Sequence, residues 1–104
     1  MSYLLLELLK ERPAPIVTIS GGATQTFYAG DSMTLQCFVE GLPNARITWI
    51  RDGGLPIISG QQSNGILTIP ALQNVDDGTY ICNVEGDGYP TSEGARVYID
   101  VKGN

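Results

Sequence analysis

Residues 76–82 read Asp-Asp-Gly-Thr-Tyr-Ile-Cys, and this stretch decides the fold of the 104-residue chain. From Thr79 to Val84 the residues alternate, so Tyr80, Cys82 and Val84 are expected on one side of an extended strand. That side would face a core, and a chain of this length has room for one core. The stretch therefore predicts a late β-strand in a single domain.

On both sides of this strand the chain is a series of short strand patterns separated by turn residues. Seven or eight such strands are typical of a β-sandwich or a barrel. Gly21-Gly22 interrupts the first pattern, as expected where an edge strand changes sheets. Residues 55–64, rich in Gly, Gln and Ser, are expected to be irregular. The expected strands cover residues 16–19, 24–28, 33–39, 47–51, 65–69, 79–84 and 95–101.

The cysteine and histidine content excludes most chemistry. There is no histidine, which removes His-based triads, His general bases and His metal ligands. Cys37 and Cys82 are the two cysteines, and they lie too far apart in sequence for a Cys-x-x-Cys redox pair. A structural disulfide is the natural interpretation, and it implies an oxidising compartment. We therefore expect no enzyme, no metal and no cofactor.

The charge of the chain disfavours several classes of partner. The net charge is −5, and the basic residues form no cluster. Such a chain is a poor ligand for nucleic acid, whose phosphates supply most of the affinity, and for anionic membranes or sulfated sugars. No apolar run is long enough for membrane insertion. Residues 1–14, leucine-rich at their start, are interpreted as a linker or as sequence from an expression vector, and the chain as a piece of a larger secreted protein.

Six residues at fixed spacings carry a family resemblance: Cys37, Trp49, Asp76, Gly78, Tyr80 and Cys82. With these residues the chain resembles the immunoglobulin superfamily, over residues 15–102, which implies an all-β, two-sheet Greek-key sandwich with one inter-sheet disulfide. The short interval from Trp49 to Leu67 and the interrupted first strand are similar to the I-set class. Residues 54–56, 65–69 and 77–82 are similar to the modules of perlecan-type basement-membrane proteoglycans.

The resemblance also implies structural roles. The disulfide would join Cys37 to Cys82 across the sheets, with Trp49 packed on it and Leu67 inward. Tyr80 would take the tyrosine-corner position, where its hydroxyl bonds to backbone, beside Asp76 and with room left by Gly78. Closing a loop of this length stabilises the fold by roughly 4 kcal/mol in the chain-entropy model.

A candidate binding face follows from strand alternation. The outward residues of three neighbouring strands would form an apolar centre ringed by polar groups, which often marks an interface, although β-propensity alone also places such residues in strands. Tyr89, expected at a hairpin tip, is a second candidate. Aspartate at positions 81 and 98 is expected to spare stability and abolish binding. The face comprises Thr48, Ile50, Ile81, Asn83, Arg96 and Tyr98.

Two functions remain open. The leading one is an extracellular module of a matrix or cell-surface protein that binds protein partners, contacts neighbouring modules of its own chain and self-associates weakly. The alternative is an intracellular structural module of a giant muscle-type protein, in which the cysteines are reduced. The loop acids, including Asp76, Asp77, Glu85 and Asp87, are interpreted as solvated or structural rather than as a calcium site.

Overall fold

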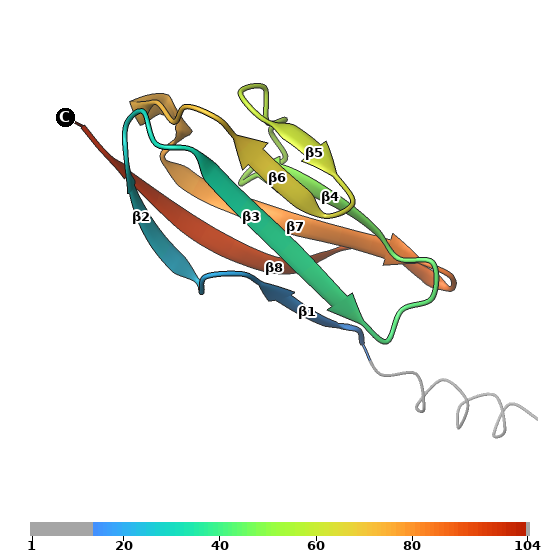
Figure 1. Ribbon diagram of the computed structural model, residues 1–104. Coiled ribbons are helices and arrows are strands. Elements are labelled where there is room, and N and C mark those ends of the chain that lie inside the picture. The colour runs from blue at the N-terminus through green and yellow to red at the C-terminus, as the bar shows by residue number, and fades with distance from the viewer. Residues whose placement is uncertain (1–13, 104) are drawn as a thin grey trace, which may run out of the picture.

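The computed structural model describes residues 14–103, which form two mostly antiparallel β-sheets packed face to face (Figure 1). One sheet has the order β1-β3-β6-β5 and the other the order β2-β8-β7-β4. The strands are β1 (Ile16–Ile19), β2 (Thr24–Tyr28), β3 (Met33–Glu40), β4 (Arg46–Arg51), β5 (Gln61–Ser63), β6 (Ile66–Ile69), β7 (Gly78–Gly86) and β8 (Tyr89–Lys102), with a 3-10 turn, η1 (Asn74–Asp76). No helix among the described residues is long and apolar enough to cross a membrane.

The first strand pattern divides between the two sheets, as the glycine pair predicted. β1 pairs with β3, whereas β2 pairs in parallel with β8 in the opposite sheet. Gly21 and Gly22, between them, have φ of 87° and 95°, a region that residues with a Cβ rarely adopt. The glycines thus let one edge segment serve both sheets (Figure 1).

The buried core agrees with the inward-facing residues that strand alternation predicted. Alternate residues of β3, β6, β7 and β8 point inward and are buried, and Cys37 is joined to Cys82 across the sheets. Trp49 is the register partner of Cys82, and its indole Nε1 donates to the carbonyl oxygen of Gly65 at 2.9 Å. The inward set comprises Met33, Leu35, Cys37, Trp49, Leu67, Ile69, Leu72, Tyr80, Cys82, Val84, Val97, Ile99 and Val101.

Two expectations about local structure were wrong. The stretch 55–64, expected to be irregular, ends in β5, which pairs with β6 through the two-residue turn Asn64-Gly65. Both turn residues have positive φ, 51° and 82°, as the tight hairpin requires. β8 also begins earlier than expected, at Tyr89, so the hairpin after β7 is shorter than predicted.

Candidate functional site

A hydrogen-bonded corner before β7 fixes one end of the sandwich. The Tyr80 hydroxyl donates to the Asp76 carbonyl oxygen at 2.6 Å, as the resemblance implied. The buried Asp76 carboxylate accepts from the Gln73 backbone N–H at 2.8 Å and from the Ser59 hydroxyl at 2.7 Å. Both carboxylate oxygens are therefore occupied by structural bonds. Among the described residues no group of three or more acidic, Cys or His side chains could hold a metal.

Arg51, at the end of β4, ties this corner to the facing strand. Its Nη1 donates to the Val75 carbonyl oxygen at 2.8 Å and its Nη2 to that of Asp77 at 2.5 Å. The guanidinium carbon lies 5.2 Å from the centroid of the Tyr80 ring, within cation–π range. Gly78 has φ of 140°, and a Cβ there would lie 2.7 Å from Arg51 Nη2. A residue with a Cβ would be strained at this φ, and it would also displace the guanidinium from its carbonyl partners.

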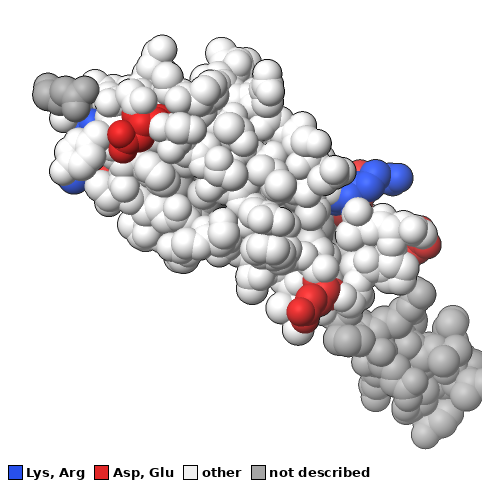
Figure 2. Space-filling view, in the orientation of Figure 1, with Lys and Arg blue, Asp and Glu red and all other residues white. Residues whose placement is uncertain are grey.

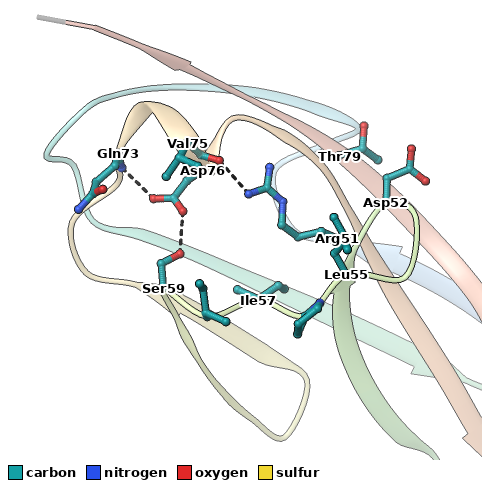
Figure 3. A pocket seen from close by; sticks show the side chains of 11 residues that line it. Arg51, Asp52, Leu55, Ile57, Ser59, Gln73, Val75, Asp76 and Thr79 are labelled. Atoms are coloured by element: carbon teal, nitrogen blue, oxygen red, sulfur yellow. Dashed lines mark hydrogen bonds between the residues drawn. The ribbon is translucent and has the colours of Figure 1, made fainter.

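Beside this corner lies an apolar hollow of about 570 Å³, between residues 55–59 and η1 (Figure 3). Leu55, Pro56, Ile57, Ile58 and Val75 supply its walls. Ile58 is 92% exposed and Val75 is 71% exposed, so these side chains are unburied on their outer side. The polar groups at its base are mostly engaged with one another, which leaves apolar contact as the main attraction to a ligand. This arrangement can receive an apolar side chain.

Sequence reasoning missed this hollow. The signal was present as the run Leu55-Pro56-Ile57-Ile58, an apolar quartet inside a segment without strand alternation. Apolar residues in an irregular surface segment have no β-propensity to explain them, unlike apolar residues in a strand. The other wall, Val75, could not be placed because the 3-10 turn that presents it depends on the Asp76 bonds.

The predicted binding face is assembled by the strand register but is less apolar than expected. Ile50 on β4 lies opposite Ile81 on β7, which lies opposite Arg96 on β8. The prediction that Ile81 is exposed was wrong, since it is 5% exposed. It points outward, but it lies on a central strand between Ile50 on β4 and Arg96 on β8. Thr48 is exposed and Asn83 is half-buried, and these complete the face with Tyr98.

The polar groups of this face are largely paired with one another. Arg96 donates to both oxygens of Glu93, at 2.8 and 2.7 Å, and the hydrogen bond lowers the pKa of the Glu93 carboxyl. The Tyr98 hydroxyl donates to Asp77 Oδ1 at 3.0 Å, which raises the pKa of Tyr98. The backbone N–H of Val101 donates to Asp77 Oδ2 at 2.8 Å, and this bond is the main cause of a lowered pKa at Asp77. These side chains brace the sheet and present few unpaired groups to a partner.

Tyr89, the second candidate, lies at the start of β8 and pairs with Gly86. It directly follows the Asp87-Gly88 turn, is half-buried and packs against the core cluster, so only part of its side chain is available to a partner. Residues 1–12, considered for self-association, lie outside the described residues.

Comparisons with known proteins agree with this geometry. The sequence model described as "Immunoglobulin domain" matches residues 14–85. Contactin-3 of Rattus norvegicus is 36% identical over 66% of this chain, and Hemicentin-1 of Homo sapiens is 36% identical over 69%. The basement membrane proteoglycan of Caenorhabditis elegans is 32% identical over 66%. The chain spans 7%, 1% and 2% of those three relatives.

Solved structures share the fold. The tandem Ig repeats of Dlar superpose with a TM-score of 0.71 at 23% identity, covering 91% of this chain and 52% of that one. The titin domains Z1Z2 in complex with telethonin give 0.65 at 21% identity, covering 88% and 49%. At these identities the likeness concerns the fold alone.

Proposed function

The chain belongs to the immunoglobulin-domain family, and from that membership we propose that it is a non-enzymatic extracellular module of a matrix or cell-surface protein. It binds protein partners and spaces the modules around it. The observation that carries the proposal is the buried Cys37–Cys82 disulfide, because such bonds persist in oxidising compartments and are rare in the cytosol. The names of the matched relatives, which include a basement membrane proteoglycan and a vascular cell adhesion protein, support the same compartment.

We assign the module to residues 15–102 and to the I-set class, with residues 1–14 as a linker. Three features support the class: a first strand shared between the sheets, β4 as the edge of its sheet, and no strand pair inserted between β4 and β5. A perlecan-type parent is the finer form of the proposal, supported by the match to the basement membrane proteoglycan.

The apolar hollow is the surface best suited to a neighbouring module of the same protein. Its η1 wall lies at the end of the sandwich where β8 ends (Figure 1). The matched relatives are many times longer than this chain, as expected of modular proteins. An apolar loop of the next module entering the hollow would cover Ile58 and Val75, which are otherwise exposed.

The state of the two thiols in the cells that make the protein tests the compartment. Intact cells are treated with a membrane-permeant alkylating reagent before lysis, and the peptides containing Cys37 and Cys82 are then analysed by mass spectrometry. Unmodified, linked peptides are the expected result. Alkylation of both cysteines in most copies would overturn the extracellular assignment and favour the intracellular, tension-bearing alternative.

The junction is tested in the parent protein by Ile58→Asp, with Thr48→Asp, an exposed position outside the hollow, as the matched control. Small-angle scattering should show a larger radius of gyration for Ile58→Asp, since a charge in the hollow releases the neighbouring module. Identical scattering from both variants would show that the hollow does not hold a neighbour.

A further inference from the structure

The two sheets differ sharply in charge. Strands β1, β3, β5 and β6 together contain one charged residue, Glu40, which ends β3. The strand charges of the other sheet lie on β4, β7 and β8. The protein carries a net charge of −5, so a whole sheet nearly free of acids is a distinct surface. Figure 2 shows this side, with red and blue confined to its rim.

We call the outward residues of this sheet the neutral face. Most of them carry hydroxyl or amide groups, which can form hydrogen bonds with one another. Hydroxyl and amide side chains each carry both a donor and an acceptor, so a surface made of them needs no partner of opposite charge. Removing such a face from water also avoids the cost of burying an unpaired charge. Glu40, opposite Ile16 at the end of β3, points to the same side and forms the charged border of this face. The neutral face comprises Ile16, Thr18, Thr34, Gln36, Phe38, Gln61, Ser63, Ile66 and Thr68.

The neutral face carries both a projection and a hollow. Phe38, opposite Thr18 on β1, is 46% exposed. On the β6–β5 side lies a hollow of about 320 Å³, lined among others by Gln61, Ser63 and Ile66. Strand spacing separates the projection from the hollow by roughly 12 Å. A two-fold axis between them, close to the Gln36–Ile66 pair of β3 and β6, would place each projection in the other copy's hollow.

We propose that two copies of this chain pair through the neutral face, with Phe38 of each copy seated in the β5–β6 hollow of the other. Such a contact is isologous, because the same residues meet in both directions, and it closes at the dimer. A second copy is favoured over a basic partner because a basic protein would be drawn to acids that lie on other surfaces.

Electrostatics selects this face for self-pairing. Two chains of charge −5 repel one another, and the repulsion is weakest when their acids are farthest apart. Pairing through the neutral face puts both charged sheets outermost. Each is separated from the interface by the sheet spacing of about 10 Å, which exceeds the Debye length of about 8 Å at physiological salt.

The area of the neutral face limits the affinity of the dimer. Strands β1, β3, β5 and β6 contain 4, 8, 3 and 4 residues, which at about 3.3 Å per residue and about 4.8 Å between strands give roughly 300 Å² per copy. The total of roughly 600 Å² is smaller than a stable specific interface buries, so the dimer is weak and forms at high local concentration. Its affinity should change little with salt, because no charge pair crosses the contact.

The test is sedimentation equilibrium of the full chain from about 10 μM to about 1 mM, a range that spans weak dimer constants. We expect a monomer–dimer equilibrium that Phe38→Glu weakens at least tenfold and that Thr26→Glu, at an exposed position of β2 in the other sheet, leaves unchanged. Ser63→Lys should weaken self-pairing too. Mixing the Phe38→Glu and Ser63→Lys chains should restore a heterodimer, since the new carboxylate and ammonium would then meet. Thermal unfolding of each variant shows that it folds.

Three results would overturn the proposal. The first is a monomer throughout the range. The second is a dimer that folded Phe38→Glu and Ser63→Lys chains form as well as the parent. The third is a dimer that Leu8→Glu alone abolishes, which would assign association to the leucine-rich N-terminal segment. None of these outcomes bears on the thiol measurement, so the proposed function and the self-pairing fail separately.

Discussion

Replacing Tyr80 by Phe tests the corner that shapes the hollow, because it deletes one oxygen atom and leaves the ring in place. The hydroxyl is fully buried and donates to the Asp76 carbonyl oxygen at 2.6 Å. Burial is the main cause of a raised pKa at Tyr80, so the group remains a protonated donor at neutral pH. The Phe ring would keep its packing and its contact with the Arg51 guanidinium.

Stability should fall because the Asp76 carbonyl oxygen loses its hydrogen-bond donor. A buried carbonyl left without its partner costs about 1–3 kcal/mol, more than the bond itself contributes. For a domain of this size, 1 kcal/mol corresponds to roughly 4–8 °C in Tm. We therefore expect Tyr80→Phe to lower the free energy of unfolding by about 2 kcal/mol and Tm by roughly 8–16 °C.

Urea unfolding at pH 7, with the disulfide intact, measures this loss. The fluorescence of Trp49, the one tryptophan of the chain, reports the transition from a buried site in the core. Tyr28→Phe is the matched control, because Tyr28 is 56% exposed and its hydroxyl should contribute within about 0.5 kcal/mol. A Tyr80→Phe protein as stable as the control would show that the corner bond is not needed to hold η1.

Three further changes probe other parts of the molecule. Ile81→Asp is expected to destabilise by about 3 kcal/mol in urea unfolding, since it buries an unpaired charge, whereas Thr48→Asp should stay within about 0.5 kcal/mol; equal effects would contradict the burial of Ile81. Gly65→Ala should lower Tm more than Gly53→Ala, although both have positive φ, because only at Gly65 would a Cβ meet another side chain, the Ile47 Cδ1 at 2.8 Å; equal losses would contradict this reasoning. The pKa of Asp77 is lowered from its ordinary value of 3.8, so its contribution to stability is present above pH 3.8 and is lost as the pH falls toward the folded-state pKa. Urea midpoints at pH 6 and pH 2.5 should therefore differ less for Asp77→Asn than for the parent, and an equal difference would exclude this carboxylate as a source of the acid sensitivity.

The fold could be predicted because it depends on features that neighbouring residues display. Alternation in β3 and β7 placed Cys37 and Cys82 inward, and the glycine pair at 21–22 marked the change of sheet. These are local consequences of strand geometry. β5 was missed because Gln61–Ser63 has no apolar alternation. It forms because the Asn64-Gly65 turn folds it back onto β6.

The candidate site was predicted less well because exposure is a property of the assembled sheet. Alternation correctly turned Ile81 away from the core, but it cannot report that side chains on β4 and β8 cover it. Pairing between Tyr98 and Asp77 is likewise long-range, joining residues 21 positions apart. The hollow depends on the contact between η1 and a loop before β5, which no periodicity encodes.

The side chain of Gln62 disfavours the addition of a strand at the β4 edge and so favours association through a sheet face. Its side-chain amide accepts a hydrogen bond from the Trp49 backbone N–H and donates to the Trp49 carbonyl oxygen, both at 2.8 Å. β4 is an edge strand, and these are the groups that an incoming strand would need. One side chain of β5 thus occupies the middle of the β4 edge in the other sheet. The same segment borders the hollow of the neutral face, so β5 both blocks strand addition at β4 and shapes the surface on which two copies would meet.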